Sequence, residues 1–376
     1  MRPIGTSLNP LIALVLFVFV GISSAVAQPV FPNVTVETVA TGLRSPWALT
    51  QLPDGQWLIS EKSGSIVLLS ENNQKQYLGD VPPDIYVAGQ GGLLDIELHP
   101  DFAQNGFVYI TYAAGEPDAN YLAIARAVYA QGSLAAWERL FSVNSLKDTP
   151  VHYAGRLAFL ADGSLLVSVG DGFDYREDAQ RNTSMLGKIL RLSDTGEALA
   201  DNPFYTGAGG PQDFIYSLGH RNMQGLVYDA KNNQVLAHEH GPAGGDEINV
   251  ITAGANYGWP VVTRGKDYSG ANISPFETYP GMVEPIVNWT PSIAPAGMVQ
   301  YRGEELAELD GDLLITALKP PHFHWVRIQN GERLIQKPVV GSLAMRLRDV
   351  AVGQGGAVYL LTDGDDASLL RMTSAD

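Results

Sequence analysis

The sequence predicts an all-β protein, specifically a six-bladed β-propeller of four-stranded antiparallel blades. The chain is rich in turn-forming residues, with 40 Gly and 23 Pro among 376 residues. A Gly-containing turn followed by a short β-rich run recurs along it. A four-stranded blade takes about 50–60 residues, so residues 28–376 are long enough for about six blades. The alternative, a large β-sandwich with long loops, explains the strands but less well the recurrent blade-like unit.

The recurring unit consists of a turn dipeptide and four to six residues that are typical of strands. Its runs are Trp57–Ser60, Phe107–Thr111, Leu165–Val169, Leu313–Thr316 and Val358–Leu361. No convincing long amphipathic helix is visible, and the best helical candidate, residues 134–141, is short. No charge run or low-complexity linker divides the chain. We therefore expect a single propeller domain over residues 28–376.

Residues 1–27 are predicted to be an export signal peptide rather than part of the fold. Arg2 gives a positive start, Leu11–Val20 is an apolar run, and Ala25-Val26-Ala27 forms a small-x-small cleavage pattern. An uncleaved membrane anchor is the alternative, but the run is shorter than the roughly 20 residues that cross a bilayer. The sequence therefore predicts a periplasmic or secreted protein without stable membrane insertion after cleavage.

Composition excludes several classes of function. The formal net charge of −16 argues against nucleic-acid binding, which requires a basic surface, and fits a protein that holds a divalent cation. The absence of cysteine excludes disulfides, thiolate zinc sites and a cysteine nucleophile. Stability must therefore come from the size of the core, which a chain of this length can supply.

The first polar cluster that could carry chemistry contains His152 and Asp171. The two residues are separated by about the length of one hairpin, with Asp171 directly after the strand-like run 165–169. A carboxylate that fixes the tautomer of a histidine makes the other ring nitrogen a competent base near neutral pH. A single histidine at a strand end is more often structural, so the pair by itself is weak support.

The second cluster spans residues 219–225 and 238–247, where glycines alternate with charged and amide side chains. Glycines allow the backbone to approach a ligand, and exposed carbonyls bind calcium together with carboxylates. His238 and His240 share one face of a strand, so zinc or copper is an alternative. Calcium ranks higher because the surrounding groups are mostly hard oxygen ligands. A polar turn with satisfied side chains would explain either half alone.

The third cluster is cationic and comprises Lys319, Arg346 and Arg348. Arg346 and Arg348 are expected on one strand face, where they repel each other unless an anion or carboxylates neutralise them. In an acidic protein this patch predicts a small polyanionic ligand. The alternative is ion pairing with the nearby Asp349 and Asp365.

Taken in order along the chain, these stretches resemble the soluble pyrroloquinoline quinone (PQQ)-dependent sugar dehydrogenases, most closely their periplasmic aldose dehydrogenase branch. The resemblance runs from about residue 40 to 370. The matching stretches are Gly42–Trp47, Gly89–Leu94, His99–Phe102, His152–Arg156, Gly170-Asp171, Gly187–Leu192, Gly219–Asn222, Glu239–Glu247, Asn256–Pro260, Pro291–Pro295 and Arg346–Val350.

The resemblance implies a role for each matching residue. His152 would be the general base and Asp171 its orienting partner. Carbonyls of Gly241 and Pro242 would hold the calcium that sits on PQQ, and Glu247 and Tyr257 look like a second calcium site. The residues that would contact PQQ are Gln90, Arg221, Asn222, His240, Ser292, Ala317, Lys319, Arg346 and Arg348.

The same resemblance implies oxidation of an aldose sugar at its anomeric carbon to a lactone, by hydride transfer to PQQ. Electrons would then pass to an acceptor such as a small redox carrier or a cytochrome, and the protein would be a monomer or homodimer. His240 replaces a glutamine of the glucose-oxidising branch, and residues 172–176 do not match that branch. Much of its sugar-shaping loop is also missing, so the sequence does not identify glucose as the substrate.

Two other classes of function fit these residues less well. A calcium-dependent propeller hydrolase, such as a lactonase, would need no cationic patch for an ester substrate. A non-catalytic sugar-binding propeller would not need both His152 and Asp171. The sequence therefore favours the dehydrogenase.

Overall fold

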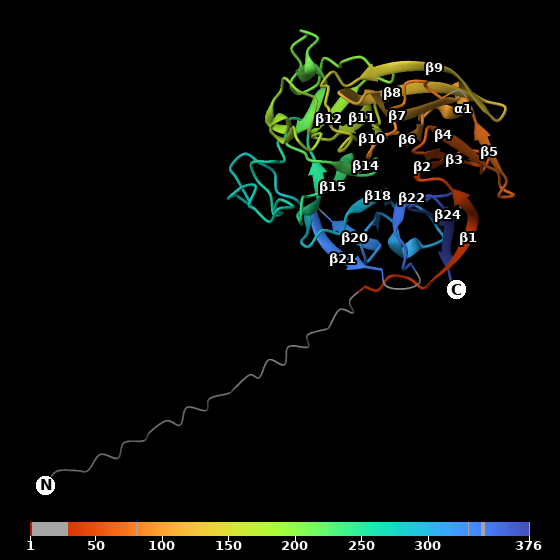
Figure 1. Ribbon diagram of the computed structural model, residues 1–376. Coiled ribbons are helices and arrows are strands. Elements are labelled where there is room, and N and C mark those ends of the chain that lie inside the picture. Colours follow the sequence, from red (N-terminus) through yellow and green to blue (C-terminus); the bar gives the residue numbers. More distant parts are fainter. Residues whose placement is uncertain (2–28, 80, 330, 340–342, 376) are drawn as a thin grey trace. The chain divides into compact units, whose positions relative to one another are not determined.

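The computed structural model describes residues 1, 29–79, 81–329, 331–339 and 343–375. Within these residues, 24 strands form six four-stranded antiparallel sheets, arranged as the blades of a propeller (Figure 1). The predicted fold class is confirmed. Apart from Met1, the predicted export signal lies outside the described residues, so it stays a prediction. None of the described helices is long and apolar enough to cross a membrane.

The first three blades follow one another along the chain, and in each the strands pair in sequence order. Blade 1 contains β2 (Pro46–Gln51), β3 (Trp57–Glu61), β4 (Ser65–Leu69) and β5 (Lys75–Leu78). Blade 2 contains β6 (Leu93–Leu98), β7 (Phe107–Glu116), β8 (Ala119–Ala130) and β9 (Ser133–Ser142). Blade 3 contains β10 (Ala154–Phe159), β11 (Leu165–Val169), β12 (Lys188–Leu192) and β13 (Ile215–Leu218).

The last three blades repeat this order, except that the sixth borrows its outer strand from the start of the chain. Blade 4 contains β14 (Met223–Asp229), β15 (Gln234–Glu239), β16 (Asp246–Ile251) and β17 (Val287–Trp289). Blade 5 contains β18 (Pro295–Gln300), β19 (Leu313–Ala317), β20 (Phe323–Gln329) and β21 (Glu332–Pro338). Blade 6 contains β22 (Leu347–Val352), β23 (Val358–Thr362), β24 (Ala367–Ser374) and β1 (Val34–Leu43).

The pairing of β1 with β24 closes the propeller. Val34 lies opposite Ser374 and Leu43 opposite Ala367, so the two ends of the described chain share one sheet. The first strand of the chain thus completes the last blade and joins the two ends of the described chain.

The recurring turn-and-strand unit corresponds to the second strand of a blade. The five predicted runs lie in β3, β7, β11, β19 and β23. Blade 4 lacks a visible copy because its second strand, β15, follows Asn232-Asn233 instead of a glycine turn. The only helices of the described residues are short, namely α1 (Phe102–Asn105), η1 (Arg176–Gln180), η2 (Pro211–Phe214) and η3 (Ala307–Leu309).

Residues 134–141, the best helical candidate in the sequence, do not form a helix. This segment belongs to β9, the outermost strand of blade 2, where it pairs with β8. Its Ala, Leu, Glu and Arg residues favour helices, but pairing along the blade edge decides the structure.

The topology brings polar residues to one end of the propeller axis. The first strands of neighbouring blades, β2, β6, β10, β14, β18 and β22, pack against one another around this axis. In an antiparallel pair, the start of the first strand and the end of the second lie at the same edge. Residues just before the first strands therefore meet residues just after the second strands.

Candidate active site

The structure places the predicted site residues at this one end of the axis. Those at or before the first strands are Gln90, His152, Arg221, Asn222, Ser292, Arg346 and Arg348. Those at or after the second strands are Asp171, His240, Gly241, Pro242, Ala317 and Lys319. Residues that are distant in sequence are thus brought together by the blade geometry.

His152 and Asp171 form a buried dyad, as predicted. His152 Nδ1 lies 2.7 Å from Asp171 Oδ1. The second carboxylate oxygen accepts a hydrogen bond from the indole nitrogen of Trp259 at 2.8 Å. Gly170 permits this approach, because a Cβ at that position would lie 2.1 Å from the carbonyl oxygen of His152. The carboxylate is therefore fixed on both sides and orients the imidazole.

The electrostatics of the dyad favour a neutral histidine beside an ionised aspartate. Burial lowers the pKa of His152 below its usual value, although the hydrogen bond and charge of Asp171 oppose the shift. Burial alone would raise the pKa of Asp171, but hydrogen bonding to His152 and the charge of Arg221 hold it below its usual value. Nδ1 then carries the proton toward Asp171, and Nε2 keeps the lone pair that a base needs.

Two cavities adjoin the dyad. The first, here called the cationic cavity, has a volume of about 320 Å³ and includes Lys62, Gln90, Asn222, His240, Arg346 and Arg348 in its lining. The second, the aromatic cavity, has a volume of about 250 Å³ and includes Phe173, Arg221, Pro242, Trp259 and Tyr268.

His152 contacts one lining residue of each cavity. Its backbone N–H donates to Gln90 Oε1 at 2.8 Å, and Gln90 belongs to the cationic cavity. Its ring meets the ring of Phe173 edge-on at 5.2 Å, and Phe173 belongs to the aromatic cavity. The dyad is therefore positioned between an anion-attracting space and a space walled by aromatic rings.

Arg346 and Arg348 both line the cationic cavity, but their carboxylate partner is one that the sequence did not suggest. Arg346 Nε donates to Asp363 Oδ2 at 2.8 Å, and Arg348 Nη2 donates to Asp363 Oδ1 at 2.6 Å. The suggested partners were wrong, because Asp349 pairs with Arg156 and Asp365 accepts from Ser45. One carboxylate between two guanidinium groups leaves a surplus positive charge.

The surroundings of Asp363 favour its ionised form. Its burial would raise its pKa, but the charges and hydrogen bonds of Arg348 and Arg346 outweigh this effect and lower it. Arg346 precedes β22 rather than lying within it, so the two arginines flank the start of that strand. The proposed mutual repulsion between them is therefore partly relieved inside the protein.

Three other residues that were predicted to contact PQQ lie at the same end of the propeller axis, and they differ in exposure and in hydrogen-bond partners. Lys319 is exposed and follows Leu318, which lines the cationic cavity. Ala317 is buried at the end of β19. The hydroxyl of Ser292 donates to Asp246 Oδ2 at 2.7 Å, so Ser292 is held by that carboxylate.

At the first predicted calcium position, two backbone carbonyl oxygens point at the guanidinium group of Arg221. Arg221 Nη1 donates to the carbonyl oxygens of Gly241 at 2.8 Å and of His240 at 3.2 Å. Backbone oxygens that already point at one cation suit a hard metal ion. Calcium at the Gly241 carbonyl would require the guanidinium of Arg221 to move away.

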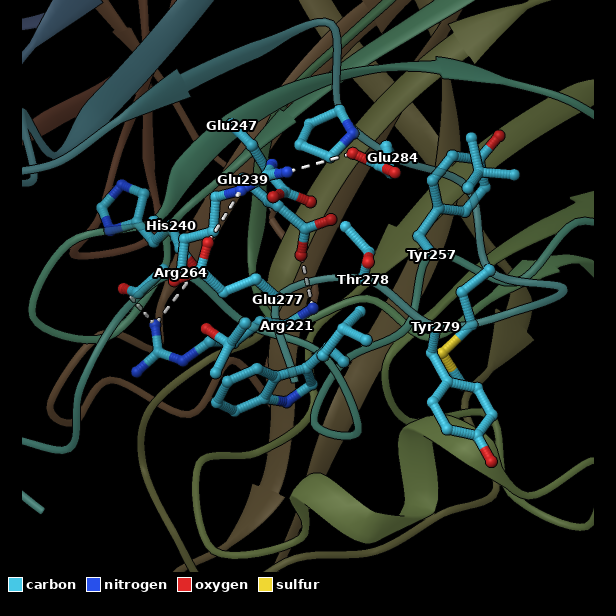
Figure 2. A pocket seen from close by; sticks show the side chains of 18 residues that line it. Arg221, Glu239, His240, Glu247, Tyr257, Arg264, Glu277, Thr278, Tyr279 and Glu284 are labelled. Atoms are coloured by element: carbon cyan, nitrogen blue, oxygen red, sulfur yellow. Dashed lines mark hydrogen bonds and ion pairs between the residues drawn. The ribbon is translucent and has the colours of Figure 1, made fainter. Parts of the chain in front are cut away.

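The second predicted calcium position is a small acidic cavity of about 30 Å³ (Figure 2). Glu247 and Tyr257 both line it, together with Glu239, Glu277 and Glu284. Burial and the charge of Glu239 raise the pKa of Glu247. The hydroxyl of Tyr257, however, donates to the carbonyl of Val250 at 2.6 Å. This hydroxyl is therefore occupied. Among the carboxylates, Glu277 and Glu284 pair with Arg264, and Glu239 accepts from the backbone N–H of Arg221, so calcium would have to displace these partners.

The described residues contain no ready-made cluster of three or more His, Cys, Asp or Glu side chains for a metal ion, and this holds for the zinc or copper alternative at His238 and His240 as well as for the acidic cavity. His238 is fully buried, whereas His240 Nε2 lies 2.6 Å from the carbonyl oxygen of Pro295. Burial lowers the pKa of both rings, so both are neutral.

Sequence reasoning missed several residues of the site. Lys62 adds a cation to the cationic cavity, Asp363 bridges the arginines, and Trp259 holds Asp171. Trp259 lies in the stretch Asn256–Pro260, which matches the family, so the sequence carried a signal for it. Lys62 and Asp363 each follow the second strand of a blade, as Asp171 does, and this shared position could have identified them.

Comparisons with known proteins agree with this geometry. Residues 43–371 match the glucose/sorbosone dehydrogenase family. The aldose sugar dehydrogenase YliI of Escherichia coli is 33% identical, covering 91% of this chain and 93% of that protein. The apo-form crystal structure of the soluble E. coli aldose sugar dehydrogenase has a TM-score of 0.86 at 32% identity, covering 91% of this chain and all of that one. The PQQ-bound aldose sugar dehydrogenase of Streptomyces coelicolor has a TM-score of 0.73 at 30% identity, covering 91% and 99%.

Proposed function

The chain belongs to the glucose/sorbosone dehydrogenase family, and we propose that it is a PQQ- and calcium-dependent aldose sugar dehydrogenase. It would oxidise the anomeric carbon of an aldose to a lactone. The observation that carries this proposal is the buried His152–Asp171 dyad, which adjoins a cavity with a surplus of positive charge. The PQQ-bound relative from S. coelicolor supports the choice of cofactor.

The residues of the cationic cavity fit PQQ, a planar tricarboxylate. Arg346 and Arg348 supply guanidinium groups that match carboxylates in geometry, and Lys62 adds a third charge. Gln90 and Asn222 supply amide groups for the polar ring edges. Calcium would be held by the carbonyls of Gly241 and Pro242 once Arg221 has moved, and by acidic side chains at the second position.

His152 performs the proton transfer in this proposal. Asp171 accepts a hydrogen bond from Nδ1–H, so Nε2 is free to take the proton of the anomeric hydroxyl. Burial keeps the imidazole neutral before the reaction, and the ionised Asp171 stabilises the positive ring afterwards. The chemistry supplied by bound PQQ would be that of a hydride acceptor, which bound calcium would make more electrophilic. Trp259 and Gln90 keep the dyad oriented.

The proposed function also implies a location, an oligomeric state and an electron acceptor. The protein would be exported, with cleavage after Ala27, and would act as a monomer or homodimer. A small redox carrier or a cytochrome would accept its electrons. A lactonase-like hydrolase is disfavoured by the cationic cavity, and a non-catalytic sugar-binding propeller by the intact dyad.

Reconstitution with PQQ and calcium tests the proposal. We expect an ultraviolet–visible quinone band that aldoses reduce, together with dye-linked oxidation across an aldose panel. His152→Ala is expected to bind PQQ nearly normally and to lose about 10²- to 10⁴-fold in rate, the usual contribution of a general base. Normal turnover in this variant would refute the base assignment, and a band that no aldose reduces would refute the dehydrogenase.

Removal of metal tests the calcium requirement. A chelator is expected to abolish PQQ affinity and activity together, and calcium is expected to restore both. Full activity after exhaustive calcium removal would contradict the requirement. Recovery with zinc or copper alone would return attention to His238 and His240.

A further inference from the structure

Lys147 is a buried lysine behind the dyad that no step of the proposed reaction uses. It lies between β9 and β10, and it is only 3% exposed. No carboxylate of the described residues lies within ion-pair distance of its ammonium group. Burial of a charged group is costly, and an apolar side chain would fill the same space at less cost. The lysine therefore calls for an explanation beyond packing.

The ammonium of Lys147 is held by a small polar network. Nζ donates to Asn120 Oδ1 at 2.8 Å and to the carbonyl oxygen of Thr149. It also lies 3.4 Å from the centre of the Tyr153 ring. The hydroxyl of Tyr153 donates to the same Asn120 oxygen at 2.6 Å. Tyr153 follows His152 directly and lines the cationic cavity, so the network reaches the site from behind.

The same lysine supports the turn that carries Asp171. Thr149, whose carbonyl binds Nζ, donates its hydroxyl hydrogen to the carbonyl oxygen of Gly172 at 2.6 Å. Gly172 has φ +71°, and a Cβ there would lie 2.9 Å from Cδ of Lys147. The side chain of Lys147 therefore packs directly against the residue that follows Asp171.

The charge of Lys147 acts on the dyad. It lowers the pKa of His152, as Arg221 does, in addition to the larger effect of burial. Burial lowers the pKa of Lys147 itself to about 7, opposed by the charges of Asp171 and Asp148. His152 titrates below its ordinary range, where Lys147 still carries its proton, so the two positive charges compete.

We propose that Lys147 is a positioning residue of the dyad, which anchors the Asp171 turn through Thr149 and places a buried positive charge behind His152. Its catalytic importance rests on the proposed function. Its effect on His152 does not, because that effect exists in the protein without any ligand.

The test is a pH titration of the histidine ring nitrogens by NMR on the full chain without added cofactor. His152 is assigned by comparison with His152→Asn among only seven histidines. Lys147→Gln removes the charge but keeps hydrogen-bonding ability. We expect the pKa of His152 to rise by about 0.5 to 1 unit, the scale of one nearby charge.

Two further variants separate charge from support. Lys75→Gln is the matched control, because Lys75 also donates to two backbone carbonyls, of Thr41 and Gly42, but is exposed. It should leave His152 unchanged. Thr149→Val removes the bond to Gly172 and keeps the charge, so we expect an unshifted pKa of His152 but a lower kcat in the reconstituted enzyme.

Each result supports or overturns one of the two roles of Lys147. An unchanged pKa of His152 in folded Lys147→Gln overturns the electrostatic role, and an unchanged kcat in Thr149→Val overturns the support of the turn. Should Lys147→Gln fail to fold, Lys147→Met removes the charge and keeps an apolar chain of similar length in the buried space, and an unshifted pKa of His152 in that variant is equally decisive. If the shift occurs but the reconstituted wild type oxidises no sugar, the proposed function fails while the coupling of Lys147 to His152 stands.

Discussion

Two clusters in this propeller use the same charged groups in opposite ratios. Near the axis, one arginine lies between two carboxylates: Arg156 donates to Asp95 at 3.0 Å and to Asp349 at 2.9 Å. At the cationic cavity, one carboxylate lies between two arginines: Asp363 accepts from Arg346 at 2.8 Å and from Arg348 at 2.6 Å. The first has a surplus of negative charge and the second a surplus of positive charge.

The two clusters also differ in their place in the fold. Arg156 lies on β10, Asp95 on β6 and Asp349 on β22, so the first cluster ties three blades together across the axis. The second cluster is confined to blade 6, and Arg346 is 54% exposed. The first therefore belongs to the framework, whereas the second presents charge to a ligand.

The direction of each pKa shift follows from this difference. Burial raises the pKa of Asp95 to about 6 and also raises that of Asp349, because one arginine does not fully compensate two buried carboxylates. Two arginines around Asp363 overcome the effect of its burial and lower its pKa. Charge ratio and burial together, rather than the presence of an ion pair, decide whether a cluster stabilises the ionised state.

The largest effect is expected for Arg156→Met. The substitution leaves Asp95 and Asp349 buried without their shared cation, which typically costs about 3–5 kcal/mol in the free energy of unfolding. Denaturant melts should show this loss at pH 7. A loss below about 1 kcal/mol would mean that the first cluster is not the framework element described above.

The next effect concerns pH and has opposite signs in the two clusters. The pKa of Asp95 is raised from 3.8 to about 6, so its stabilising contribution is present below about pH 4 and is lost as the pH rises to 6, by about 2–3 kcal/mol. The lowered pKa of Asp363 has the reverse effect, with a contribution lost as the pH falls below its usual range.

Urea melts of Asp95→Asn and Asp363→Asn between pH 3 and 8 measure this contrast. Relative to wild type, Asp95→Asn should gain stability as the pH rises from 4 to 6, and Asp363→Asn should change its relative stability only in acid. The same pH dependence in both variants would contradict the distinction between the clusters.

A smaller effect is expected when the second cluster loses an arginine. Arg348→Gln should weaken PQQ binding by about 10- to 100-fold, the scale of a charge-assisted hydrogen bond. Titration calorimetry measures this loss. Because Asp363 would keep only Arg346, the ligand-free protein should melt slightly lower, and not higher as simple repulsion between the arginines would suggest.

Arg302→Gln is the matched control for this measurement. Arg302 also contacts two carboxylates, Asp229 and Asp310, but it lines a separate cavity at the other end of the first strands. It should leave PQQ affinity unchanged. Equal losses in both variants would point to a general effect of net charge instead of a specific contact.

Strands that local turn patterns mark could be predicted from the sequence. Pairings between residues that are distant in the chain could not. Glycine turns identified five second strands, and the family resemblance, with weak support from the spacing, pointed to the pair of His152 and Asp171. The pairing of β1 with β24 was not visible, because the partners lie at opposite ends of the chain. The partners of Arg346 and Arg348 were misassigned for a similar reason, since Asp349 is taken by Arg156 from blade 3.

The smallest effect, and the most informative for the second cluster, is expected for Asp363→Asn. Asp363 competes with the carboxylates of PQQ for both arginines, so its neutralisation should tighten PQQ binding, by about 3- to 10-fold, less than one charge-assisted pair. The ligand-free variant should lose a little stability, because the arginines then repel each other without a bridge. Titration calorimetry and thermal melts report the two effects separately. If binding weakens instead, Asp363 acts mainly by holding the guanidinium planes in place, and pre-organisation outweighs charge competition at this site.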